Sequence, residues 1–67
     1  MLKTIEIEGL EKTVTIDTDS IKPYTTSIGD VYEEAVIADN GSFVAYDDAS
    51  NSWIQLWPTT PPDYYDQ

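Results

Sequence analysis

The stretch that most constrains the fold is "AVIADNGSFVAYDD", residues 35–48, in which Asn-Gly separates two apolar runs. Asn-Gly between apolar runs is the strongest short-range mark of a β-hairpin, because a type I′ turn needs positive φ at both central residues. With Asn40-Gly41 as the turn, the expected cross-strand pairs are Ala38 with Phe43, Ile37 with Val44 and Ala35 with Tyr46. The stretch therefore predicts two antiparallel strands joined by a tight turn.

A second hairpin is predicted at the start of the chain. In "LKTIEIE" apolar and polar residues alternate, which places Ile5 and Ile7 on one face of a strand. In "KTVTID" the same alternation places Val14 and Ile16 inward. Gly9 lies between the two runs, where a turn is expected.

The stretch "SIGDVYEEAVIAD", residues 27–39, fits two structures. As a helix it carries an apolar stripe, and Ser27 is a candidate N-cap. As a strand it points either Glu33 or Glu34 toward the core face, which is costly if that face is buried. Gly29 and the β-branched residues weaken the helix. A short helix near 27–35 that leads directly into a strand satisfies both patterns, and helix and strand remain alternatives here. A loop is expected before it, over 17–27.

The last strand is predicted at "WIQLW", residues 53–57. Trp53, Gln55 and Trp57 share one face, and Ile54 and Leu56 share the other. Because both faces are partly apolar, this strand is either central in the sheet or carries a contact surface.

These patterns predict a mainly β fold. We expect an antiparallel sheet of about five short strands in hairpins, with at most one short helix near 27–35. With the helix the domain is a small α+β, β-grasp-like fold, and without it a small meander or barrel. Residues 1–57 form the expected single domain, and residues 58–67 form a tail rich in proline, tyrosine and aspartate.

Composition excludes several kinds of chemistry. The chain has no cysteine and no histidine, which excludes disulfides, thiolate zinc sites and serine–histidine triads. Loops starting at Asp17, Asp47 or Asp48 fail the EF-hand pattern. A sheet this small offers little room for a cleft between paired carboxylates. We expect a protein that is not an enzyme and has no metal and no cofactor.

Charge points to the kind of partner. Thirteen acids face three lysines, for a net charge of −10. Lys3, Lys12 and Lys22 all precede Pro23, and no basic residue follows it. Such a chain repels nucleic acid and anionic membranes and attracts basic protein surfaces. The alternative is that the acidity only keeps a small domain soluble.

Targeting signals are not recognisable. No apolar run approaches the roughly 20 residues that cross a bilayer, and the N-terminus lacks the regions of a signal peptide. We therefore expect a cytoplasmic protein.

Carboxylates spaced along a sheet can imitate the phosphate row of a duplex. In size and charge the chain resembles the small acidic inhibitors that phages use against restriction, CRISPR or repair enzymes. The resemblance implies a DNA-mimic inhibitor in the basic groove of a nucleic-acid-processing protein. The expected partner-binding residues are Asp30, Glu33, Glu34, Asp39, Asp47, Asp48, Tyr46, Trp57, Asp63 and Tyr64. Tyr32 and Trp53 are further candidate anchors, with core packing as the alternative for these aromatics.

The tail offers a second function. Pro58-Thr59-Thr60-Pro61 is a PxxP sequence, and Pro61-Pro62-Asp63-Tyr64 is a PPxY sequence of the kind read by WW domains. The alternative protein is thus an adaptor or accessory domain whose tail is a peptide ligand. A small subunit of a larger assembly is a third hypothesis.

Overall fold

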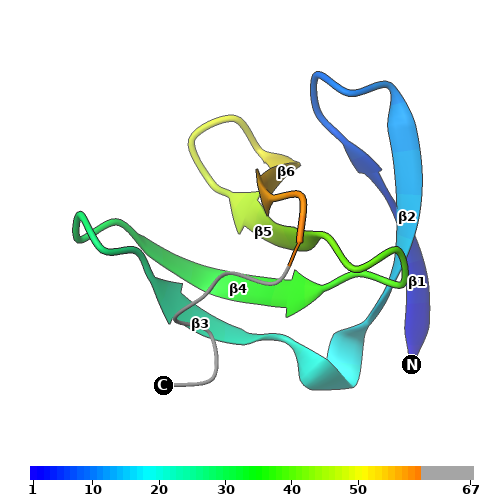
Figure 1. Ribbon diagram of the computed structural model, residues 1–67, viewed down its shortest axis with the longest axis horizontal. Coiled ribbons are helices and arrows are strands. Elements are labelled where there is room, and N and C mark those ends of the chain that lie inside the picture. Colours follow the sequence, from blue (N-terminus) through cyan, green and yellow to red (C-terminus); the bar gives the residue numbers. More distant parts are fainter. Residues whose placement is uncertain (60–67) are drawn as a thin grey trace.

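The computed structural model describes residues 1–59, which form one six-stranded sheet. The strands are β1 (Leu2–Ile7), β2 (Lys12–Asp17), β3 (Lys22–Thr25), β4 (Val31–Ile37), β5 (Phe43–Asp47) and β6 (Ser52–Trp57), with a 3₁₀ helix, η1 (Thr18–Ser20), between β2 and β3. Their order across the sheet is β2-β1-β6-β5-β4-β3 (Figure 1). The mainly β class is confirmed. The predicted number of about five strands is too low, because β3 lies in the segment expected to be a loop.

The first hairpin is confirmed. β1 and β2 pair antiparallel with Ile5 opposite Val14. Ile5, Ile7, Val14 and Ile16 share one face of this hairpin and are buried. The turn between the strands includes Gly9 at φ +84, a conformation that glycine adopts without steric cost.

The sheet is mixed and not purely antiparallel, which corrects the prediction. β6 lies between β5 and β1 and runs antiparallel to β5 but parallel to β1. The parallel ladder consists of the pair Ile7–Trp53, and the N–H of Glu8 donates to the Trp53 carbonyl at 3.0 Å. The central position expected as one option for residues 53–57 is confirmed. Hairpin patterns predict pairing between strands that are neighbours in sequence, so they did not reveal this distant contact.

The helix predicted near 27–35 is wrong. Residues 26–30 form a turn in which Thr26 N–H donates to the Asp30 carbonyl at 2.8 Å, and Gly29 has φ +94. β4 follows at once, and Glu33 and Glu34 are both exposed in it. The first half of β4 pairs with β3 alone among the described strands, while β5 begins to pair at Ala35. Tyr32 in this half is partly buried, but Glu33 and Glu34 both stay exposed, so the cost of a buried glutamate does not arise.

The hairpin around Asn40-Gly41 exists with a register one residue different from the prediction. Ile37 pairs with Phe43, Val36 with Val44 and Ala35 with Ala45. Ala38 N–H donates to Ser42 O at 2.8 Å, and Gly41 N–H donates to Ala38 O at 3.0 Å. The loop thus holds three residues and only Gly41 has positive φ, at +88, as in a type I turn closed by a glycine bulge. Asn40 Oδ1 accepts from the N–H and hydroxyl of Ser42, which favours this longer loop.

The sheet buries apolar residues on both of its faces. One cluster joins the first hairpin to β4 and β5, with Ile5, Ile7, Val14, Ile16, Val36, Ala38 and Val44 at its centre. The other consists of Tyr24, Ala35, Phe43 and Ala45. Consecutive residues of β5 enter different clusters, so this strand is covered on both sides. Each large side chain so buried contributes roughly 1.5–3 kcal/mol.

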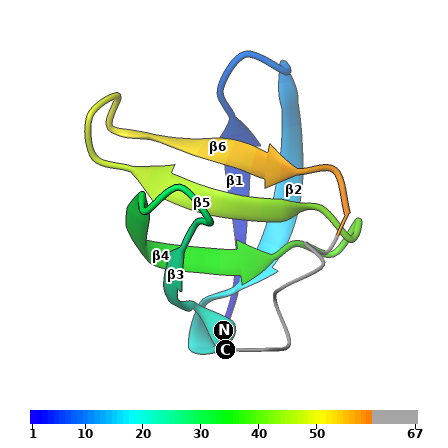
Figure 2. The same ribbon diagram turned by 60° about the vertical axis from the view of Figure 1, so that its left-hand side comes forward.

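The first cluster forms because the sheet folds back over itself. Figure 2 shows β1 and β2 running across the direction of β4, β5 and β6. The β4–β5 turn reaches the outer edge of β2, where Asp39 N–H donates to Thr15 O at 2.9 Å and Thr15 N–H donates to Asp39 Oδ1 at 3.2 Å. The fold is thus a strongly curled sheet that closes at one point through a turn.

Candidate functional site

A surface pocket of about 370 Å³ lies between the β1–β2 turn and the β5–β6 turn. Both turns lie toward the top of Figure 1. We name it the acid–aromatic pocket, and its lining residues are Glu6, Glu8, Gly9, Tyr46, Asn51, Ser52 and Trp53. Two glutamates and two aromatic residues therefore contribute to its lining.

The parallel contact between β1 and β6 brings these walls together. Trp53 is the ladder partner of Ile7, and its carbonyl accepts from Glu8 N–H. The alternation of β1 buries Ile7 and leaves Glu6 and Glu8 exposed. The backbone at Glu8 thus lies beside the backbone of Trp53.

The aromatic wall is held by its own contacts. Tyr46 and Trp53 are opposite one another on β5 and β6, with ring centroids 5.6 Å apart and an interplanar angle of 69°. This is the edge-to-face arrangement that aromatic pairs prefer. The Tyr46 hydroxyl donates to Asn51 Oδ1. Trp53 also packs against the first core cluster, so both rings are held in place.

The pocket carries negative charge without a base in its lining. In residues 1–59 the ion pairs join the Met1 amine to Asp17 at 3.0 Å and to Asp19 at 2.8 Å, so Glu6 and Glu8 have no basic partner there. The lining of the pocket is therefore acidic.

The N-terminal ion pairs perturb two ionisable groups. The pKa of Asp17 is lowered, first because its carboxylate accepts the N–H of Asp19 and second because of the Met1 amine. The pKa of the Met1 amine is raised by the carboxylates of Asp19 and Asp17. These groups hold the start of β1 beside η1 and lie outside the pocket.

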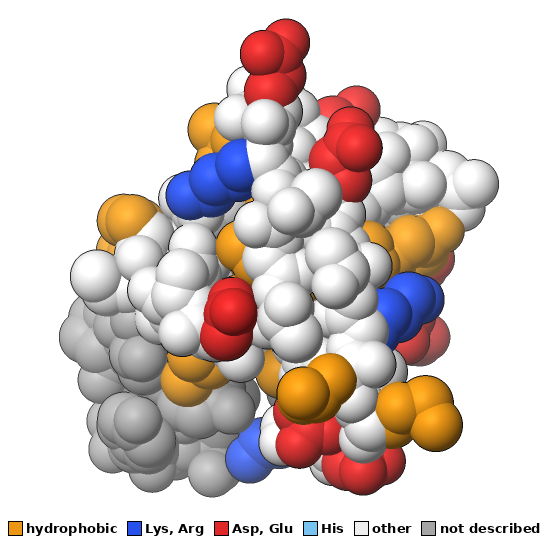
Figure 3. Space-filling model, turned by 90° about the vertical axis from the view of Figure 1, so that its right-hand side faces the viewer, with side chains coloured by type: hydrophobic (Ala, Val, Ile, Leu, Met, Phe, Trp, Pro, Cys, Tyr) orange, Lys and Arg blue, Asp and Glu red, His pale blue; other side chains and the backbone are white. Residues whose placement is uncertain are grey.

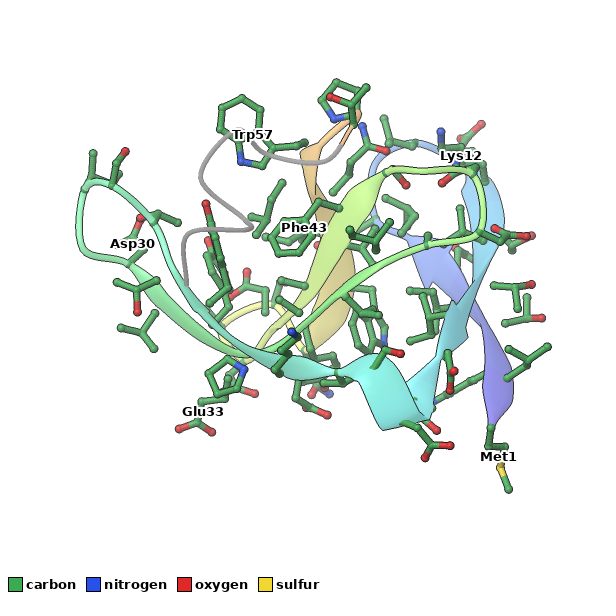
Figure 4. All side chains as sticks on the ribbon, turned by 60° about the horizontal axis from the view of Figure 1, so that its bottom comes forward. Met1, Lys12, Asp30, Glu33, Phe43 and Trp57 are labelled. Atoms are coloured by element: carbon green, nitrogen blue, oxygen red, sulfur yellow. The ribbon has the colours of Figure 1, made fainter. Side chains whose placement is uncertain are left out.

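Three of the predicted site residues lie on a projecting hairpin. We name β3, the 26–30 turn and the first half of β4 the β3–β4 arm. Asp30, Glu33 and Glu34 are exposed on it, and Figure 4 shows Asp30 at the far end of the arm and Glu33 pointing outward, away from Phe43. Ile28 and Val31 on the same arm are 84% and 64% exposed. The structure thus gathers carboxylates and apolar side chains on one projection.

The other predicted aspartates lie in separate turns. Asp39 binds the edge of β2 through Thr15. Asp47 Oδ1 accepts from Ala49 N–H at 3.2 Å and its Oδ2 accepts from Ser50 Oγ at 3.0 Å, so its carboxylate orders the β5–β6 turn. Asp48 in the same turn is exposed. Asp39 and Asp47 therefore have structural partners besides any role in binding.

The predicted aromatic residues also lie in different parts of the structure. Tyr46 lines the acid–aromatic pocket, while Trp57 lies at the end of β6 and is 42% exposed. Asp63 and Tyr64, and with them the PPxY sequence, lie outside the described residues.

The predicted site list did not include Glu6 and Glu8. Both belong to the part of the chain that contains the lysines, which made it look electrically mixed. Figure 3 shows lysine side chains among carboxylates on the face toward β1 and β2. The available signal was the strict alternation of "TIEIE", which places both glutamates on the solvent face of their strand. Trp53 was a candidate anchor in the sequence, although nothing there placed it beside β1.

Within residues 1–59 no three acidic side chains group as metal ligands would. In the same part of the chain no helix has the length and apolarity to cross a bilayer.

Known proteins give no match. Neither models of protein families, nor curated protein sequences, nor solved structures show significant similarity to this chain.

Proposed function

We propose that this chain is a non-enzymatic inhibitor whose carboxylates occupy the basic groove of a nucleic-acid-processing protein and exclude the nucleic acid. The observation that carries the proposal is the β3–β4 arm. Its exposed carboxylates Asp30, Glu33 and Glu34 have no basic partner within residues 1–59. They are the charges of the described chain best placed to enter a groove.

The geometry of the arm suits insertion into a groove better than contact with a flat surface. Successive residues of a strand point to opposite faces, so Glu33 and Glu34 present charge on both sides of the arm. A groove that encloses the arm meets carboxylates on each wall, as it would around a strand of nucleic acid. Ile28 and Val31 add exposed apolar surface, which supplies contact energy that salt does not screen.

The test is displacement of DNA. Fluorescent duplex DNA is bound to each of a panel of basic proteins, comprising a restriction endonuclease, a CRISPR effector and a uracil-DNA glycosylase, and the chain is titrated in while anisotropy is followed. We expect displacement from at least one member that weakens by about tenfold or more between about 50 mM and about 300 mM salt. Failure to displace the duplex from any member at low salt contradicts the proposal.

A matched pair of variants separates the arm from net charge. Glu33→Gln with Glu34→Gln removes two charges from the arm, and Glu11→Gln with Asp19→Asn removes two from the β1–β2 side. We expect the arm variant to lose about tenfold or more in displacement, and the control to lose much less. Equal losses would show that only total charge matters and that the arm has no special part.

A further inference from the structure

We propose that residues 60–67, which lie outside the described part of the chain, pack on the second apolar cluster and cover that face of the sheet. The cluster consists of Tyr24, Ala35, Phe43 and Ala45. The proposal does not rest on the inhibitor function, because it concerns a contact of the chain with itself. It joins the burial of this cluster, the place where β6 ends and the composition of the tail.

The burial of the second cluster calls for a covering layer. Phe43 and Ala45 are 0% exposed and Ala35 is 2% exposed. The first cluster has such a layer, because β2 packs against β4 where the sheet curls. Within residues 1–59 no contact of that extent between strands distant in the sheet covers the second cluster, whose partly buried neighbours belong to β4 and β6. Since a sheet buries an apolar face by packing it against another segment, a further segment is expected here.

The tail starts at the border of this cluster. β6 ends at Trp57, which is the ladder partner of Phe43. From β6 the strands β5, β4 and β3 follow in order across the sheet, and crossing them takes about 14 Å at the usual spacing between strands. The eight residues 60–67 span about 26 Å when extended. The tail is therefore long enough to cross the cluster from β6 to Tyr24 on β3.

The composition of the tail fits an aromatic surface. Tyr24 and Phe43 meet edge to face with ring centroids 4.9 Å apart. Proline-rich segments dock on surfaces lined by such rings, because their extended conformation exists before binding and costs little to order. The tail supplies two prolines and two rings, from Pro61, Pro62, Tyr64 and Tyr65. Rings packed on rings stabilise a contact beyond the apolar area that they bury.

Charge supports the same occupant. Lys22 lies on β3 as the ladder partner of Ala35, and so at the border of the cluster. It is the last base of the chain, while the tail carries Asp63 and Asp66 and no base. An exposed ion pair contributes little energy, so these charges orient the tail and the rings supply most of the stabilisation.

This contact controls access to the PPxY sequence. Residues 61–64 form that sequence, and in the docked tail they lie against the sheet. A WW domain then binds only the fraction of molecules in which the tail is released, and its apparent affinity falls by that fraction. The sheet and a WW domain thus compete for one segment.

The first experiment is NMR spectroscopy of the whole chain. We expect nuclear Overhauser contacts between the ring protons of Tyr64 or Tyr65 and those of Tyr24 or Phe43. A mixture of isotope-labelled and unlabelled chains distinguishes contacts within one molecule from contacts between two copies. Absence of these contacts, or contacts found only between copies, overturns the proposal.

Variants measure the contribution of the tail to stability. Tyr64→Ala with Tyr65→Ala removes both rings and should lower Tm by about 4 °C or more. Tyr64→Phe with Tyr65→Phe keeps both rings and should change Tm by less than about 2 °C. An unchanged Tm in the alanine variant, or an equal loss in both variants, overturns the proposal.

Access to the tail is measured with a WW domain chosen because it binds a synthetic peptide of residues 58–67. We expect the whole chain to bind this domain about tenfold or more weakly than the peptide does. Equal affinities overturn the proposed control of access. None of these measurements involves DNA, so the tail contact and the inhibitor function fail separately.

Discussion

The Trp53 carbonyl accepts the N–H of Glu8 at 3.0 Å, at the point where the described sheet has its parallel pair of strands. This short ladder is the hydrogen-bonded link between the first hairpin and β6. The rest of the attachment comes from the first core cluster and from the contact of Asp39 with Thr15. The position of the pocket therefore depends on apolar packing as much as on backbone pairing.

Loss of a methyl group in the first cluster should weaken that attachment. Ile7 is 1% exposed and pairs with Trp53. We expect Ile7→Val to lower the free energy of unfolding by about 0.5–1.5 kcal/mol, measured by urea denaturation. Leu2→Val on the same strand is the control, because Leu2 is 73% exposed and should change stability by less than about 0.5 kcal/mol. Equal effects would contradict the assignment of Ile7 to the core.

A large-to-small substitution in the second cluster should destabilise the fold more than Ile7→Val does in the first. Phe43 is completely buried and meets Tyr24 edge to face with centroids 4.9 Å apart. We expect Phe43→Ala to cost about 3–5 kcal/mol. A domain of this size has roughly that much stability in total, so circular dichroism should show a largely unfolded variant. Phe43→Leu keeps most of the volume and should remain folded. A stable Phe43→Ala protein would show that this cluster contributes little.

The turn at Gly41 gives a backbone prediction. Gly41 has φ +88, and a Cβ added there meets no atom within 4 Å, so substitution should cost conformational energy alone. We expect Gly41→Ala to lower the free energy of unfolding by about 1–2 kcal/mol. Gly41→Asn should cost less, because asparagine tolerates the left-handed region. Thermal unfolding of the two variants checks this order, and the reverse order would argue against the three-residue loop.

The contact between Asp39 and Thr15 predicts a local effect. Asp39→Ala removes the carboxylate that accepts from Thr15 N–H and should cost about 0.5–1.5 kcal/mol. Asp39→Asn keeps an acceptor and should cost less. Hydrogen exchange at the Thr15 amide is the measurement, with faster exchange expected in Asp39→Ala. Unchanged exchange there would mean that the turn does not protect the β2 edge.

The N-terminal ion pairs predict a pH dependence. The pKa of Asp17 is lowered, so its contribution to stability is present above its ordinary pKa and lost as pH falls through the lowered value. The pKa of the Met1 amine is raised above 8.0, so its contribution is present below that value and lost as pH rises through the raised one. The pair is thus complete between about pH 4 and about pH 8.

Thermal unfolding of Asp17→Asn, with a free or an acetylated N-terminus, measures this effect. We expect the substitution to lower Tm more in the free-amine protein than in the acetylated one at about pH 6, and the difference to fade at about pH 2 and about pH 11. Comparing the free-amine and acetylated proteins cancels the change in Tm that comes merely from removing one negative charge from an acidic chain. A difference that does not change with pH would contradict the ion pair.

Patterns within short stretches of sequence were sufficient to predict the structures that depend on residues close together in the chain. The alternation of β1 and β2 and the turn at Gly9 were sufficient for the first hairpin. The helix prediction failed because apolar residues of β4 fit helical spacing, while the strand leaves both Glu33 and Glu34 exposed. The predicted register around Gly41 was wrong because the sequence indicates a turn but does not show whether two or three residues form it. Pairing of β1 with β6 depends on the curl of the whole sheet, so the pocket was not predictable.

The edge formed by β3 restricts how any partner can join this fold. β3 has four residues, and its ladder with β4 is irregular between Lys22 and Tyr24, where Pro23 lies. Proline has no N–H to donate, and a strand that is both short and bulged is a poor template for another strand. Fibril growth and strand addition are therefore disfavoured at this edge, and recognition at this edge must depend on side chains.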